Sequence, residues 1–143
     1  MNIASVLASK GARVVTVRPE QTIREALALL AEHNIGALVV TGGRGKPAGM
    51  VSERDIVRTL ALDEAAFDWT VGRIMTEVIA GAPDDDLNIV AHTMTERRIR
   101  HLPVVDGDRL VGIVSIGDVV KAQRDRYLGE LDTLQIQLLQ ERA

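Results

Sequence analysis

The amino-acid sequence predicts a mixed α/β fold of the α+β type, made from two copies of one β-α-β-β-α unit. The first observation is an internal repeat, because residues 14–40 align without gaps to residues 78–104. The second is its continuation: residues 49–57 match residues 112–120 after a slightly shorter loop. The third is a composition that is 46% hydrophobic but only 2% aromatic, which indicates an aliphatic core. Because one unit alone buries little surface, we expect the copies to pack with approximate two-fold symmetry.

In the first copy, turn and capping residues separate the apolar segments. Pro19 is expected to end an extended segment, and Thr22 to cap the helix that follows it. Apolar residues in this helix recur at the spacing of one buried face, and the sequence GGRGKP is a turn by composition. The expected elements are an extended segment at 14–18, a helix from Ile23 to about His33, strands at 37–41 and 48–52, and a helix beginning near Glu53.

The second copy repeats this order. Asp86 is the expected helix cap, followed by a helix to about Arg97, strands at 102–105 and 110–114, and a helix after Ile116. The chain is accordingly divided into an N-terminal helical segment (1–13), a first repeat (14–60), a connector (61–77), a second repeat (78–122) and a C-terminal helix (123–143).

Composition and charge exclude several classes of function. The formal net charge is −3, and the only tight basic group is Arg97, Arg98 and Arg100, so no nucleic-acid surface is expected. Arg97 and Arg98 are interpreted as solvated residues at a helix end. There are no cysteines, no signal-peptide pattern and no apolar run long enough for a membrane span, which together favour a cytoplasmic protein.

The titratable residues do not suggest catalysis. The three histidines, His33, His92 and His101, lack the short spacing of a metal site. No nucleophile is combined with a base in a known arrangement. We therefore expect neither a bound metal nor catalytic residues.

A serine and an aspartate follow the last strand of each copy, as Ser52 with Asp55 and as Ser115 with Asp118. A helix N-terminus offers unpaired N–H groups and a positive dipole that attract anions. The hydroxyl could donate to a phosphate, and the carboxylate could accept both hydroxyls of a ribose. The same residues are also ordinary helix caps. The residues alone leave both interpretations open.

The segments GMVSERD (49–55), IMT (74–76), RHLPVVD (100–106) and GIVSIGD (112–118) together resemble a pair of cystathionine-β-synthase (CBS) domains, or Bateman module, of the stand-alone bacterial type. The resemblance covers about residues 10–122. It implies binding of adenosine-containing ligands (AMP, ADP, ATP, S-adenosylmethionine or NAD(H)) between the repeats, and a disc-like homodimer. The arginines near the expected phosphate positions favour nucleotides over S-adenosylmethionine.

The resemblance further implies two pseudo-symmetric pockets. In the first, the expected residues are Asp118 on the ribose, Ser115 and Gly117 in the turn at the phosphate, Arg100 reaching the phosphates, and Thr16, Val17, Ile35, Gly36 and Ala37 around the adenine. In the second they are Asp55 on the ribose, Ser52 and Arg54 toward the phosphate, and Ile99, Arg100 and His101 along the base. The sequence departs from the pattern at Ala80, the counterpart of Thr16, so the Asp118 pocket is the better supported.

The C-terminal segment predicts one further surface. Tyr127, Leu131, Leu134 and Leu138 recur in steps of four and three, which makes a narrow apolar seam on a helix. We expect this seam to dock on its own module, with a second subunit or a target protein as the alternative.

The function predicted for the chain is a non-catalytic sensor of adenine nucleotides. The alternative is a structural interaction protein with vestigial pockets that acts through its C-terminal helix.

Overall fold

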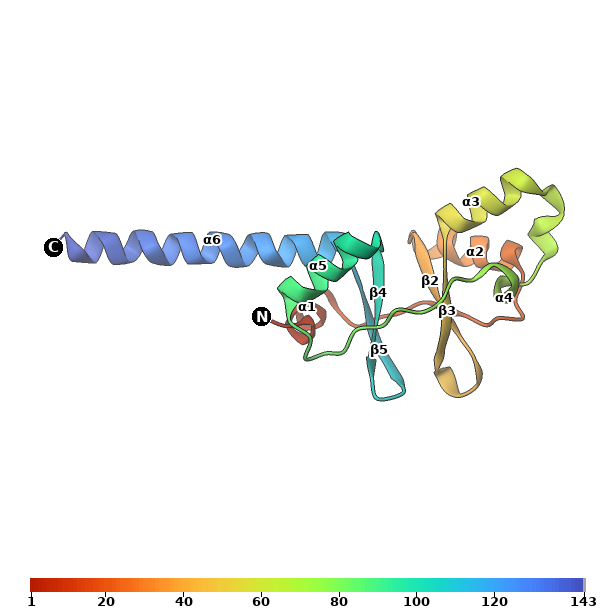
Figure 1. Cartoon of the computed structure of the whole chain (residues 1–143), viewed down its shortest axis with the longest axis horizontal. Coiled ribbons are helices and arrows are strands. Elements are labelled where there is room, and N and C mark those ends of the chain that lie inside the picture. Colours follow the sequence, from red (N-terminus) through yellow and green to blue (C-terminus); the bar gives the residue numbers. More distant parts are fainter. Residues whose placement is uncertain (143) are drawn as a thin grey trace.

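The structure, a computed structural model, describes residues 1–142 and contains two repeats that lie side by side. Each repeat presents a β-hairpin whose loop points the same way, with its helices at the outer sides (Figure 1). The tandem α+β architecture is the one predicted from the sequence repeat.

The first repeat has a three-stranded sheet in the order β1-β2-β3. β1 pairs parallel with β2, and β2 pairs antiparallel with β3. The elements are β1 (Thr16–Val17), α2 (Ile23–His33), β2 (Ala37–Thr41), the short 3₁₀ helix η1 (Gly43–Gly45), β3 (Pro47–Ser52) and α3 (Glu53–Leu62). All four residues from Ala37 to Val40 are buried, which explains the continuous apolar run of this central strand.

The second repeat has the same order with one strand almost lost. Its elements are α5 (Leu87–Arg97), β4 (His101–Asp106), β5 (Arg109–Ser115) and the long helix α6 (Ile116–Glu141). The counterpart of β1 is reduced to one parallel bridge between Gly81 and Val104. Ala80 and Gly81 stand where the first repeat has Thr16 and Val17. Alanine and glycine favour a strand less than threonine and valine do, which accounts for the loss.

The helix caps follow the sequence prediction. Thr22 accepts a hydrogen bond from the backbone N–H of Glu25, and Asp86 accepts from Asn88 and Ile89. Each of the two capped helices ends on a left-handed residue, Asn34 after α2 and Arg98 after α5.

The two hydrophobic cores are each completed by a segment that precedes the other repeat. Helix α1 (Ile3–Lys10) contributes buried Ile3, Val6 and Leu7 to the core of the second repeat. Gly112 of β5 lies directly beneath it, since a Cβ there would approach the Leu7 side chain to 2.7 Å. Conversely, the connector elements η2 (Glu64–Asp68) and α4 (Val71–Ile74) contribute Ala66 and Val71 to the core of the first repeat.

Backbone hydrogen bonds hold both exchanged segments in equivalent places. The N–H groups of Ile3 and Ala4 donate to the carbonyls of Asp85 and Pro83, just before α5. In the first repeat, the N–H groups of Val71 and Gly72 donate to Gln21 and Pro19, just before α2. The N-terminal helix and the connector are therefore structural parts of the repeats, although neither belongs to the repeated sequence.

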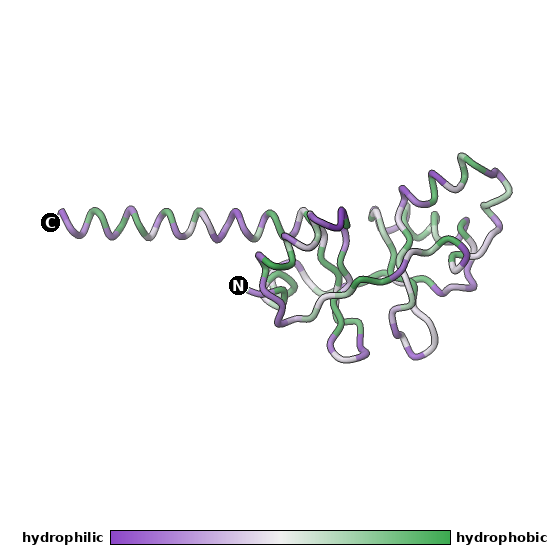
Figure 2. The backbone as a smooth tube through the Cα atoms, in the orientation of Figure 1, coloured by the Kyte–Doolittle hydropathy of each residue, from purple (hydrophilic) through white to green (hydrophobic). Residues whose placement is uncertain are grey.

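Helix α6 differs from the expectation at the C-terminal end. The helix expected after Ile116 and the helix expected at 123–143 form one continuous element. It leaves the body of the protein and projects to one side, so its last turns do not dock on their own module (Figure 1). Hydrophilic and hydrophobic residues alternate along the projecting part (Figure 2). Within residues 1–142, no helix is both long and apolar enough to cross a membrane.

Candidate functional site

Two clefts of equal size, each about 390 Å³ in volume, lie between the repeats. The first is built on Ser115 and Asp118, and the second on Ser52 and Asp55. Gly36, Ala37 and His101 line both clefts, so the start of β2 with the residue before it and the start of β4 form a shared wall. The volume is within the range of small-molecule sites, and each cleft takes residues from both repeats.

Each serine and aspartate pair forms a reciprocal helix cap. The Ser115 hydroxyl accepts from the Asp118 N–H at 3.0 Å, and the Ser115 N–H donates to Asp118 Oδ2 at 2.8 Å. Ser52 and Asp55 repeat this box at the start of α3, where the Ser52 hydroxyl also donates to Asp55 Oδ2 at 2.9 Å. The capping interpretation is therefore correct for both pairs. Among residues 1–142, the hydrogen bonds to each aspartate use only Oδ2, which leaves Oδ1 available to a ligand.

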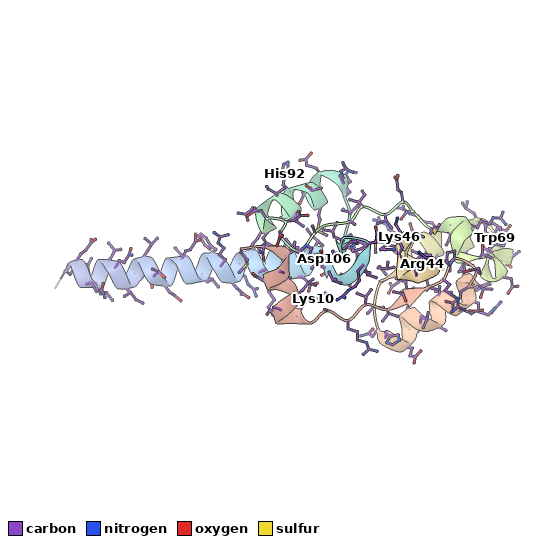
Figure 3. All side chains as sticks on the ribbon, turned by 90° about the horizontal axis from the view of Figure 1, so that it is seen from below. Lys10, Arg44, Lys46, Trp69, His92 and Asp106 are labelled. Carbon is purple, nitrogen blue, oxygen red and sulfur yellow. The ribbon has the colours of Figure 1, made fainter. Side chains whose placement is uncertain are left out.

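Lys10 distinguishes the first cleft from the second. Its ammonium group, at the end of α1, lies 2.6 Å from Asp118 Oδ2 and donates to the carbonyl of Ile113 at 2.9 Å. Figure 3 shows Lys10 on α1, beside the strands of the second repeat. Asp55 has no ion pair among the residues that the structure describes. A cation is thus placed beside the ribose-binding candidate of one cleft.

The contacts of Asp118 set its charge state. Partial burial by itself would raise the pKa of this carboxyl, but the hydrogen bonds from Lys10 and Ser115 outweigh burial and lower the pKa below its usual value. Asp118 is therefore an ionised acceptor at neutral pH.

His101 is the titratable group on the wall between the clefts. Burial lowers the pKa of its imidazole, and the nearby charge of Lys10 lowers it further. The ring is therefore mainly neutral at pH 7, and it can donate or accept one hydrogen bond at either nitrogen. A phosphate placed beside it would favour the protonated form.

The first cleft brings together most, but not all, of the residues expected there. It is lined by Ile35, Gly36, Ala37, Ser115 and Asp118 from the expected set, and additionally by Lys10, Arg13, Val14, Val15, His33, His101 and Ile113.

Four expected residues do not line this cleft. Val17 is buried in the first core. The residues of this segment that face the cleft are instead Val14 and Val15, just before β1. Thr16 is exposed on β1, and Gly117 is exposed in the first turn of α6. Arg100, the residue just before β4, lines the second cleft instead.

The second cleft contains all six residues expected for it: Ser52, Arg54, Asp55, Ile99, Arg100 and His101. The further lining residues are Gly36, Ala37, Met50, Val51, Glu53, Arg58, Thr76, Glu77, Ile79 and Arg98. Arg98 is an exposed helix-end residue, as expected, and it also contributes to this lining.

Sequence reasoning missed the cations that precede β1. Lys10 and Arg13 line the first cleft but lie outside the repeated units. Lys10 reaches Asp118 only because α1 packs on the second repeat, 108 positions away along the chain. The local sequence pattern does not predict a contact between residues so far apart in the chain.

The CBS domain family matches this chain twice, over residues 6–62 and 71–125. The chain belongs to the CBS domain family. This CBS pair is similar to the CBS-domain containing protein ATU1752 from Agrobacterium tumefaciens, with 40% identity and a TM-score of 0.80. The match covers 85% of this chain and 92% of that one.

Two similar solved structures contain adenosine compounds. The CBS domain pair of protein MJ0100, in complex with 5′-methylthioadenosine and S-adenosyl-L-methionine, is 30% identical, with a TM-score of 0.78 over 88% of this chain and 98% of that chain. The CBS domain protein PAE2072 from Pyrobaculum aerophilum, complexed with AMP, is 31% identical, with a TM-score of 0.76 over 82% and 89%. Relatives of this CBS pair thus include proteins that bind adenosine compounds.

Proposed function

We propose that this CBS pair is a non-catalytic sensor module that binds an adenine nucleotide (AMP, ADP, ATP or NAD(H)) in the clefts between its repeats. We further propose that it works as a cytoplasmic homodimer and passes the bound state to a protein target. The observation that carries the proposal is the same in both clefts: a capped helix N-terminus and a carboxylate with a free oxygen stand beside cationic side chains.

The charge of the lining favours a phosphorylated ligand. Lys10 and Arg13 line the first cleft, and four arginines, Arg54, Arg58, Arg98 and Arg100, line the second. Guanidinium and ammonium groups form charge-assisted hydrogen bonds with phosphate oxygens, and the N-terminus of α3 or α6 adds its positive dipole. The relatives that hold AMP, methylthioadenosine and S-adenosylmethionine support an adenosine moiety as the common part.

Signalling would follow from the position of the clefts. A ligand in the first cleft would touch Ile35 and Gly36 of one repeat and Ser115 and Asp118 of the other. Where the repeats exchange between two relative arrangements, the ligand would shift that equilibrium only by the difference between its affinities for the two arrangements. Both cleft serines already serve as helix caps, which supports binding rather than nucleophilic chemistry.

The test is a thermal-shift titration of the purified chain with AMP, ADP, ATP, NAD, NADH and S-adenosylmethionine. Binding to the folded state should add about 2.7 kcal/mol of stability at a ligand concentration of one hundred times Kd. We expect the phosphorylated ligands to act at lower concentration than S-adenosylmethionine. An unchanged melting temperature with all six ligands at millimolar concentration would contradict the proposal.

Lys10→Met tests the contribution of the cation in the first cleft. We expect AMP to bind there about threefold to tenfold more weakly, because one charge-assisted contact with the phosphate is lost. Adenosine has no phosphate, and its affinity should change much less. Isothermal titration calorimetry with both ligands measures this difference. Lys10→Arg retains the charge and is the control; equal losses for adenosine and AMP would show that Lys10 acts only by holding Asp118.

A second candidate function is an interaction protein that works through α6. Its favouring observation is the exposed apolar surface of that helix, where Leu134 and Leu138 are 54% and 58% exposed. Under this alternative the clefts are vestigial, and the ligand titration shows no binding.

A further inference from the structure

The projecting part of α6 carries exposed apolar side chains and, among residues 1–142, packs on no other element. Every residue from 124 to 142 is exposed, and the family match ends at residue 125. At 1.5 Å per residue, this part of the helix extends about 27 Å beyond the body of the protein. Most helical stability in proteins comes from the packing of an apolar face, which these exposed residues do not have within their own chain, and Gly129 in the middle weakens the helix further.

One seam of the helix has the spacing of a coiled coil. Residues 124, 127, 131, 134, 138 and 141 recur in steps of three and four, which keeps them on one side of the helix. Its centre is apolar, because Tyr127, Leu131, Leu134 and Leu138 occupy four successive positions. Its two ends are charged and of opposite sign, with Arg124 at one end and Glu141 at the other.

We propose that α6 pairs with α6 of a second copy of this chain as an antiparallel two-helix coiled coil centred between Leu131 and Leu134. In this register Leu131 faces Leu134, and Tyr127 faces Leu138. Arg124 faces Glu141, and two-fold symmetry forms each contact twice. The inference stands on the helix alone and does not require that the clefts bind nucleotides.

The charges of the seam decide the direction of pairing. A parallel pair would place Arg124 against Arg124 and Glu141 against Glu141, and like charges in facing positions are destabilising. The antiparallel pair converts both into attractive contacts. It also places the two protein bodies at opposite ends of the paired helices, so this association is separate from the disc-like dimer of bodies that the family resemblance implies.

Residues beside the seam are compatible with this arrangement. Antiparallel pairing places Glu130 near Gln137 and Leu128 near Gln135, without like charges. One unfavourable pair, Lys121 with Arg142, lies at each end outside the seam. Exposed charges there are screened by solvent and contribute about 0.2–1 kcal/mol, less than four apolar residues buried from each helix.

Spin-label distances test the direction. The chain has no cysteine, so a single label can be placed at Thr133→Cys or at Gln140→Cys, both exposed. In the antiparallel pair the two 133 positions have an axial offset of about 2 Å, whereas the two 140 positions have an offset of about 22 Å. We expect a short distance for the first label and a long one for the second. Short distances at both positions, or no defined distance at either, would overturn the proposal.

Substitutions in the seam test the contacts. We expect Leu134→Glu to weaken association through α6 more than about fiftyfold, measured by analytical ultracentrifugation together with the loss of the short distance between labels at position 133. Ile136→Glu is the matched control, because Ile136 is equally exposed, at 57%, but lies on the opposite side of the helix. It should leave pairing unchanged. Equal effects of the two substitutions would show that the seam is not the interface.

A charge exchange tests the facing ends. Arg124→Glu should weaken the dimer about fivefold to tenfold, because it faces Glu141 of the second copy with a like charge. Adding Glu141→Arg to the same chain should restore the affinity to within about twofold of the starting protein. Failure of the second substitution to restore pairing would overturn the antiparallel register. Because these residues lie outside both clefts, nucleotide binding by each variant is measured in parallel as a control for folding.

Discussion

Asp118→Ala is expected to weaken binding of AMP in the first cleft by about 10- to 100-fold. The substitution removes the carboxylate that would accept hydrogen bonds from the ribose hydroxyls, and hydrogen bonds to a charged group contribute about 1.5–3 kcal/mol. The remaining cleft residues would still hold the adenine and the phosphate. Isothermal titration calorimetry of the variant and the starting protein measures the affinity and the number of occupied sites.

Two controls separate this loss from a loss of the helix cap. Asp118 also caps α6 through Ser115, and removing a cap costs about 0.5–2 kcal/mol of stability. Ser115→Ala disturbs the same cap but retains the carboxylate, so it should reduce affinity less. Asp55→Ala makes the equivalent change in the second cleft and should leave the first unaffected. Unchanged AMP binding in both aspartate variants would mean that neither carboxylate contacts the ligand.

Ile3→Ala is expected to destabilise the protein by about 2–5 kcal/mol, the cost of emptying a fully buried isoleucine site. Ile3 is completely buried although it is the third residue of the chain, and it packs in the core of the second repeat. Urea unfolding measures the change in the free energy of unfolding. Ser9→Ala, at an exposed residue of the same helix, is the control and should change stability by less than about 0.5 kcal/mol.

Hydrogen exchange locates the effect of Ile3→Ala. Helix α5 shares its core with Ile3, whereas α2 belongs to the other core. Amide protection should therefore fall mainly in α5 and only slightly in α2. A loss of stability below about 1 kcal/mol, or equal losses of protection in both helices, would contradict the structural role assigned to α1.

Features that depend on neighbouring residues could be predicted well. The helix expected from Ile23 to about His33 occupies these residues, with Thr22 as its cap. The strand at 37–41 also has its predicted bounds. The pairing of serine with aspartate was recognisable because it recurs at a short, constant spacing. The sequence could not decide whether such a pair was a cap or a ligand site, and the structure shows a cap whose second oxygen is free.

Features that depend on distant contacts could not be predicted. Val17 was expected in a pocket and lies in the core, because the side chain that faces a cleft depends on how two repeats meet. Arg100 was expected in both clefts and lines only the second. The seam of α6 was expected to dock on its own module, but the helix continues straight from Ile116 and leaves the body.

The repeat, the order of helices and strands, the helix caps and the motifs typical of the CBS family could all be read from the amino-acid sequence. Hydrophobic periodicity and capping act over a few residues, so the chain records them locally. The folded structure was needed to show that α1 completes the second core, that Lys10 meets Asp118 and that His101 lies between both clefts. These arrangements arise because each repeat covers its apolar face with a segment from elsewhere in the chain, and packing between distant segments has no local pattern.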